Sequence, residues 1–99
     1  MNKVYFINLD NVNVNRLIGK LLSLGYKETY LNELSFCPYM IIHKNFDRTK
    51  TDVMYENINI GFLERIKENL ETIEAETEDE FIGYADDLIN GRTDINRLF

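Results

Sequence analysis

The chain has 99 residues, a formal net charge of −6 and a single cysteine, and 44% of its residues are hydrophobic. This length predicts one domain, residues 1–99, with a single hydrophobic core, and the composition excludes a disordered chain. One cysteine excludes an internal disulfide framework, and the negative charge argues against direct nucleic-acid binding, which needs Lys and Arg to neutralise phosphates. Because the apolar run Val4–Leu9 is too short for a signal peptide or a membrane span, we expect a cytoplasmic protein that does not enter membranes.

The first quarter of the sequence predicts a strand followed by a helix. Lys3–Leu9 carries β-branched and aromatic residues at both odd and even positions, which is typical of a strand covered on both faces. Asp10-Asn11 offers a turn and a helix cap. From Val14 onward the apolar residues recur at helical spacing, and Gly25 follows as the residue after the helix. This helix is expected to pack on the sheet that contains the first strand.

The middle of the chain predicts further strands. Phe36–His43 is apolar on both faces in its later half, and its Pro38 lies near the start, where a missing N–H is tolerated. Thr51–Glu56 is expected to return as the antiparallel neighbour of this strand. Whether Tyr26–Tyr30 adds a short strand stays open. The resulting fold class is α+β, with a small, mostly antiparallel sheet in the order strand, helix, strand, strand.

Two acidic helices are expected to follow the sheet. Asn59 can cap a helix beginning at Ile60, whose acidic face would run through Glu68 and Glu71. Thr77–Glu80 matches a capping box that opens the next helix. The segment Glu64–Asp87 therefore forms either two helices or one bent helix, and the sequence leaves that choice open.

The negative charge of the chain is concentrated in one region. Glu64–Asp87 contains ten acidic residues and only two basic ones, a formal charge of −8. Like charges one helical turn apart cost a few tenths of a kcal/mol per pair, so a chain selected only for stability would intersperse bases. The acids either keep the domain soluble or contact a basic partner. For the second case the predicted contact residues are Glu68, Glu71, Asp79, Glu80, Asp86 and Asp87.

Catalytic, cofactor and metal sites are not predicted. The five glycines are isolated, so no phosphate-binding loop is present. Cys37 and His43 could share a strand face, but a buried cysteine and a strand-end histidine are the favoured interpretation. Asp86 and Asp87 point about 100° apart on a helix, so they do not converge on one metal ion. We expect a protein that is not an enzyme and that needs no cofactor or metal.

The layout of residues 3–60 resembles small proteins of phages and mobile elements in low-GC Gram-positive bacteria. The similarity rests on a helix ending in Leu21–Tyr26 and on a hairpin from Tyr39–His43 to Val53–Tyr55. It does not include the acidic segment and carries over no catalytic residue. The resemblance implies a phage-encoded protein that acts in the host cytoplasm on a host factor, as anti-restriction and anti-CRISPR inhibitors do.

Two functions follow as hypotheses. The first is a non-enzymatic inhibitor whose acidic helices occupy the basic nucleic-acid-binding surface of a protein partner, such as a defence nuclease, by charge mimicry. The second is a structural protein that assembles as a homodimer through a sheet edge or through the apolar residues Ile95, Leu98 and Phe99. In the second case the acids are only solubilising, and the sequence does not distinguish a monomer from a homodimer.

Overall fold

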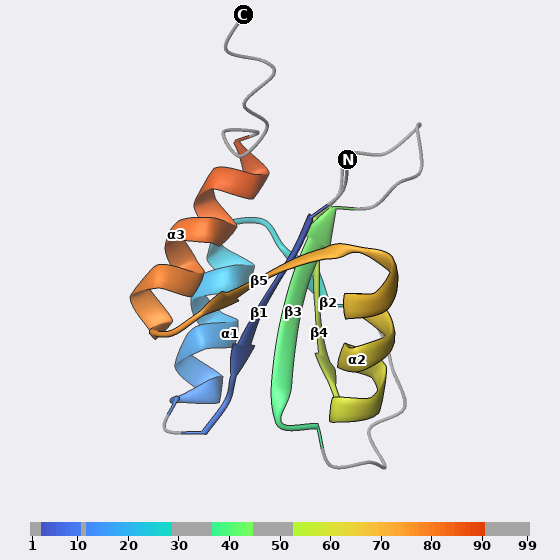
Figure 1. Ribbon diagram of the computed structural model, residues 1–99. Coiled ribbons are helices and arrows are strands. Elements are labelled where there is room, and N and C mark those ends of the chain that lie inside the picture. Colours follow the sequence, from blue (N-terminus) through green and yellow to red (C-terminus); the bar gives the residue numbers. More distant parts are fainter. Residues whose placement is uncertain (1–2, 11, 29–36, 45–52, 91–99) are drawn as a thin grey trace, which may run out of the picture.

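The computed structural model describes residues 3–10, 12–28, 37–44 and 53–90. These residues form five strands and three helices around one sheet (Figure 1). In chain order the elements are β1 (Lys3–Asn8), α1 (Val14–Ser23), β2 (Lys27–Glu28), β3 (Tyr39–Lys44), β4 (Val53–Ile58), α2 (Ile60–Asn69), β5 (Glu71–Ala75) and α3 (Glu78–Ile89).

The sheet is mixed, with the strand order β2-β4-β3-β1-β5. β3 is antiparallel to both β1 and β4, whereas β5 is parallel to β1 and β2 is parallel to β4. The α+β class is confirmed, but the prediction of a mostly antiparallel sheet is wrong. Parallel neighbours require crossover connections, and the chain makes two, β1-α1-β2 and β4-α2-β5.

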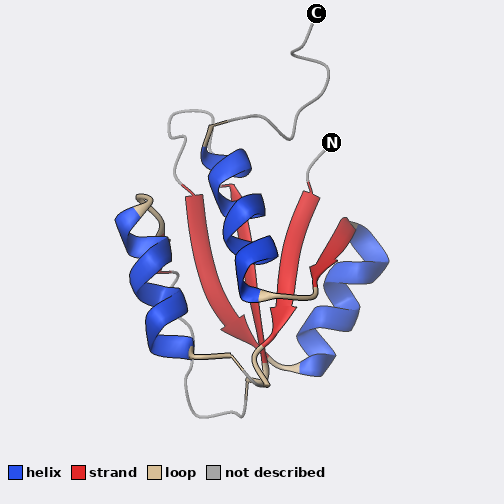
Figure 2. Cartoon of the chain, turned by 90° about the vertical axis from the view of Figure 1, so that its left-hand side faces the viewer, coloured by secondary structure: helices blue, strands red, loops and turns tan. Residues whose placement is uncertain are grey.

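The two crossovers place their helices on opposite faces of the sheet. The chain moves in one direction across the sheet from β1 to β2 and in the other direction from β4 to β5. Right-handed connections that run in opposite directions put the connecting helices on opposite faces. Helix α3 then returns to the face that α1 covers, so α1 and α3 lie side by side (Figure 2), while α2 lies on the other side of the sheet (Figure 1).

Strand β1 lies inside the sheet, between β3 and β5, and is buried on both faces, as predicted. Tyr5 and Ile7 point into the larger core under α1 and α3, together with Leu17, Leu21 and Phe81. The neighbouring β1 residues, Val4 and Phe6, point to the other face. There they form a smaller core whose remaining buried members are Ile41, Ile58 and Leu63. Alternate side chains of one strand therefore serve two cores.

The ends of the helices depend on their capping residues. Asn13, and not Asp10, caps α1, because its Oδ1 accepts a hydrogen bond from the backbone N–H of Arg16 at 3.0 Å. Asn11 lies outside the described residues. Asn59 caps α2 as predicted, accepting from the N–H of Phe62 at 2.8 Å. Capping side chains of this kind satisfy N–H groups that have no partner within the helix.

Gly25 ends α1 in the way predicted. Its φ is 102°, a left-handed value that favours glycine. The N–H of Gly25 bonds the carbonyl of Leu22, and the N–H of Tyr26 bonds the carbonyl of Leu21. These two bonds make a Schellman motif. The motif directs the chain at Tyr26 into the core and then into β2, which is Lys27–Glu28; the remaining positions of the possible strand, 29 and 30, lie outside the described residues.

The stretch Glu71–Ala75 is a strand and not part of a helix, which corrects the prediction of an extended second helix. Helix α2 ends at Asn69, and the next residue, Leu70, is already extended. Thr72 and Ile73 are β-branched and prefer a pleated strand. Pairing with β1 places Ile73 and Ala75 against the larger core. A helical conformation would retain neither the ladder with β1 nor this burial.

Tyr26 links the end of α1 to α3, and its removal should destabilise the fold. Its buried hydroxyl donates a 2.8 Å hydrogen bond to the carbonyl of Ala85. We expect Tyr26→Phe to lower the free energy of unfolding by about 1 kcal/mol, measured by urea denaturation. An unchanged midpoint would show that this hydrogen bond does not contribute.

The contribution of Tyr26 should also depend on pH. Burial, and then the neighbouring Tyr5 and Asp86, raise the pKa of Tyr26 above its ordinary value of 10. A raised pKa in the folded state stabilises the fold fully below pH 10, and this stabilisation is lost as the pH rises further. The stability difference between the wild type and Tyr26→Phe should therefore shrink above pH 10. A constant difference would contradict the assignment.

Candidate binding surface on strand β5 and helix α3

The structure separates the predicted contact residues onto the two faces of the sheet. Helix α2 carries Glu64 and Glu68 but also Arg65 and Lys67, so its formal charge is zero. It covers the smaller core, whereas α3 covers the larger one on the other face. The expected pair of adjacent acidic helices is therefore wrong. Helices α2 and α3 lie on opposite sides of the sheet (Figure 1), so Glu68, a residue of α2, does not share a surface with the acids of α3.

The acidity of the chain belongs instead to β5, the turn after it and α3. Residues 71–90 include eight acidic residues and no basic residue. Helix α3 packs beside β5, so these acids lie on α3 and along the adjacent edge of the sheet, with Glu74 pointing to the face that α2 covers. One of the eight, Glu78, turns toward α1. We call the other seven the acidic surface: Glu71, Glu74, Glu76, Asp79, Glu80, Asp86 and Asp87.

Exposure differs along the acidic surface. The first five of its residues, from Glu71 to Glu80, are exposed, whereas Asp86 and Asp87 are half-buried. Asp79 and Glu80 lie in the first turn of α3, where the positive end of the helix dipole stabilises negative charge. Asp86 and Asp87 lie near the other end, where the dipole disfavours it. The helix dipole therefore favours the acids at the start of α3 but not those at its end.

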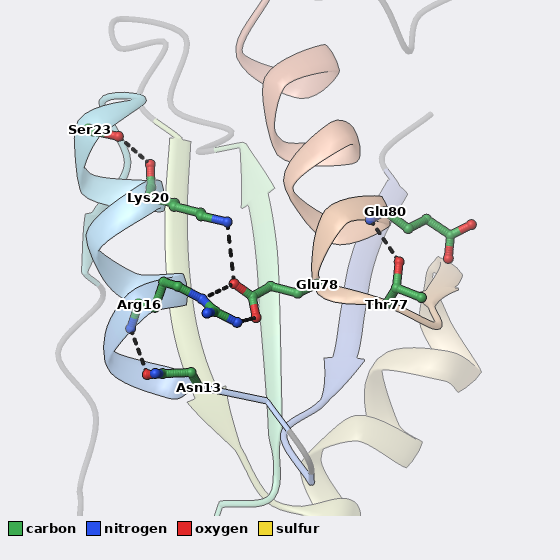
Figure 3. Close-up of polar contacts among 7 residues, drawn as sticks. All are labelled: Asn13, Arg16, Lys20, Ser23, Thr77, Glu78 and Glu80. Atoms are coloured by element: carbon green, nitrogen blue, oxygen red, sulfur yellow. Dashed lines mark hydrogen bonds and ion pairs between the residues drawn. The ribbon is translucent and has the colours of Figure 1, made fainter.

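The start of α3 is built by a variant of the predicted capping box. Thr77 Oγ1 accepts a hydrogen bond from the backbone N–H of Glu80 at 3.0 Å, as the prediction requires (Figure 3). The reciprocal bond is shifted by one residue, since Glu80 Oε1 accepts from the N–H of Glu76 at 2.6 Å. This bond holds the carboxylate of Glu80 back over the end of β5. It connects the strand and helix portions of the acidic surface.

Glu78 is removed from the acidic surface by two bases of α1. Arg16 donates to both of its carboxylate oxygens, at 2.9 and 2.8 Å, and Lys20 Nζ lies 3.4 Å from Oε1 (Figure 3). These residues line an open cleft of about 440 Å³ between α1 and α3, together with Thr77 and Asp79. Sequence reasoning missed this contact. The available signal was the position of Arg16 and Lys20 one turn apart on the polar side of α1.

The contact of Glu78 should stabilise the fold at neutral pH and not in acid. The hydrogen bond from Arg16 lowers the pKa of Glu78, and the charges of Arg16 and Lys20 act in the same direction. A lowered pKa contributes stability above the ordinary value of 4.5, and this stability is lost as the pH falls through the lower folded value. The Glu78→Gln variant should therefore have a lower melting temperature than the wild type at pH 7, and this difference should disappear below pH 4.5. The matched change Glu64→Gln on α2 should show no such dependence, and equal behaviour of the two variants would contradict this role.

An aromatic pair lies beneath the acidic surface. The ring of Tyr84 stacks on Tyr5 of β1, with centroids 4.7 Å apart. Burial raises the pKa of Tyr84, and the negative charges of Glu80 and Glu76 raise it further. Two carboxylates from different elements thus act on the same hydroxyl. Tyr84 is a structural support of the acidic surface that the sequence did not reveal.

The structure gives no support to a Cys37–His43 pair. His43 lies four residues after Tyr39 along β3, about 13 Å, and Cys37 precedes that strand. His43 Nε2 instead lies 3.6 Å from Oε1 of Glu56, a residue on β4 that is only 8% exposed. Within residues 3–10, 12–28, 37–44 and 53–90, no three acidic, His or Cys side chains are grouped to hold a metal ion. Among the same residues no helix is long and apolar enough to span a membrane.

Comparison with protein-family models, with curated proteins and with solved structures gives no match to this chain.

Proposed function

We propose that this chain is a non-enzymatic binding protein whose acidic surface occupies a basic surface of a protein partner. The partner we propose is a nucleic-acid-binding enzyme, in particular a host defence nuclease, which an anti-CRISPR or anti-restriction protein of a phage would inhibit. The observation that carries this proposal is the charge of residues 71–90, with eight acids and no base. The rest of the chain balances its acids with bases almost evenly.

The spacing of the acids would fit a partner surface that normally binds the phosphates of a nucleic acid. On α3 the pair Asp79 and Glu80 lies two helical turns from the pair Asp86 and Asp87, about 10 Å along the axis. Negative groups repeated at intervals of several ångströms also describe a nucleic-acid backbone. A groove lined with Lys and Arg would therefore attract this side of the molecule over a distance. Such steering raises the association rate and weakens as salt screens the charges.

The energetic cost of the arrangement supports a role in binding. Asp86 and Asp87 at the C-terminal end of α3 oppose the helix dipole, although Asp86 Oδ1 accepts a 3.2 Å hydrogen bond from Asn90 Nδ2. On α2 the chain does intersperse bases, since Arg65 and Lys67 accompany Glu64 and Glu68. The unbalanced charge is therefore specific to β5 and α3. A surface required only for solubility would not need to concentrate its acids there.

The homodimer remains the second hypothesis, and one observation weighs against its sheet-edge form. β5 is an end strand, so a second copy could pair with it. Two copies would then bring Glu71, Glu74 and Glu76 from each chain to one seam, and like charges in neighbouring strands are destabilising. The apolar residues Ile95, Leu98 and Phe99, the other predicted contact, lie outside the described residues. Light scattering over a range of concentrations tests this: a mass that stays at one chain excludes the homodimer.

The function is tested by a pull-down from host lysate with the full chain as bait, at low and at high salt. We expect a basic nucleic-acid-binding enzyme to be captured at low salt and released as the salt rises. The captured enzyme should lose nucleic-acid binding when the protein is added. A partner held regardless of salt, or an enzyme that still binds its nucleic acid in the complex, would contradict charge mimicry.

A further inference from the structure

Strand β5 is the last described strand at one edge of the sheet. Its inner edge pairs with β1 from Lys3–Glu71 to Ile7–Ala75, and it is the last strand in the order. Among the described residues no strand lies on its outer edge, which faces the viewer in Figure 1. An end strand presents backbone N–H and C=O groups that can pair with another chain. Proteins often protect such edges with proline or lysine, and β5 contains neither.

The charges around this edge determine which kind of added strand would pair with β5. Glu71 and Glu74 are exposed on β5 and point to opposite faces of the sheet, while Glu76 and Glu80 lie exposed just beyond its end. Two described bases, Lys3 and Lys67, lie on the inner side of β5, toward β1. Lys3 pairs in register with Glu71. Lys67 is placed over the ring of Phe6, with its Nζ 5.1 Å from the ring centroid. A strand added outside β5 would therefore meet carboxylates on both of its faces.

We propose that the outer edge of β5 pairs with an extended, Lys- and Arg-rich segment of the partner protein by strand addition. Backbone hydrogen bonds to β5 would supply affinity, and the partner's basic side chains would contact Glu71 and Glu74 on the two faces and Glu76 and Glu80 at the end. A second copy of this chain is disfavoured because it brings like charges to the seam. This inference rests on the proposed function, since it specifies how a basic partner is held.

The experiment uses two peptides of equal charge and the isotope-labelled full chain. The probe is the capped peptide KKVKKVK in L-residues, which in an extended strand presents lysines on both faces. The control has the same sequence with alternating L- and D-residues, which keeps the charge and the hydrogen-bonding groups but cannot match the backbone of an L-strand. Both are titrated at low salt, with NMR chemical shifts and amide hydrogen exchange as readouts.

The inference predicts that the L-peptide binds at least about tenfold more tightly than the control, because the control loses several backbone hydrogen bonds. It also predicts slower exchange at every second amide of β5, since the alternate amides already face β1. Equal affinity of the two peptides, or no new protection within β5, would overturn strand addition. If strand addition fails in this way, a salt-sensitive partner captured from the lysate would still support the proposed function. If β5 is protected by the peptide but the lysate yields no such partner, the proposed function alone would be contradicted.

Discussion

Replacing Phe81 with alanine should lower the free energy of unfolding by about 3–5 kcal/mol. Phe81 is fully buried and lies in the larger core between α3 and the sheet. Truncation removes its transfer free energy and leaves a cavity, because residues such as Tyr5, Leu17 and Leu21 are held by their own elements and cannot collapse into the space. Native domains have a free energy of unfolding of only about 5–15 kcal/mol, so the variant is expected to be marginally stable.

Urea unfolding followed by circular dichroism measures this effect, and Leu22→Ala is the matched control. Leu22 is also a large apolar residue, but it is 52% exposed on α1. Its truncation should change stability by about 0.5 kcal/mol or less. A loss below about 1 kcal/mol for Phe81→Ala would show that α3 does not pack on the sheet as described. The position of the acidic surface would then have to be revised.

The second large effect is expected on binding. Reversing two charges of the acidic surface, in the double variant Glu74→Lys and Glu76→Lys, should weaken capture of the basic partner by about 10- to 100-fold at low salt. Both side chains are exposed, so the fold should persist. The loss should appear mainly in the association rate and should diminish as salt is added.

Glu64→Lys with Glu68→Lys provides the control for this variant. It changes the net charge of the chain by the same amount, and its side chains are also exposed, but they lie on α2, which covers the other core than α3. We expect this control to retain binding. Equal losses in the two double variants would mean that only total charge matters. Unchanged affinity in both would remove the acidic surface from the binding site. Circular dichroism of each variant verifies folding.

Much of the local structure could be predicted because it depends on neighbouring residues. The helical spacing after Val14, the left-handed residue Gly25 and the caps Asn59 and Thr77 are all confirmed. Each of these features involves contacts within a few positions along the chain. The burial of β1 on both faces was also predictable, since apolar residues occupy both its odd and its even positions.

The main error concerned Glu71–Ala75. A helical wheel drawn through Glu64, Glu68, Glu71 and Glu74 is regular, and it suggested one acidic face. The same five residues fit a strand once β1 offers an open edge, because Ile73 and Ala75 then reach the larger core. A short segment can fit both the helical and the strand period of apolar residues, and only pairing with a strand that is distant in the sequence selects one of them.

The sequence by itself determined the charge of this protein and the type of most of its elements. The run of eight acids without a base from residue 71 to residue 90 is present before any folding. Tertiary structure decided where those charges lie. The direction of the two crossovers put α2 behind the sheet, pairing with β1 turned Glu71 and Glu74 into edge-strand residues, and Arg16 with Lys20 withdrew Glu78. These outcomes depend on contacts between residues far apart in the chain, which local pattern and composition do not encode.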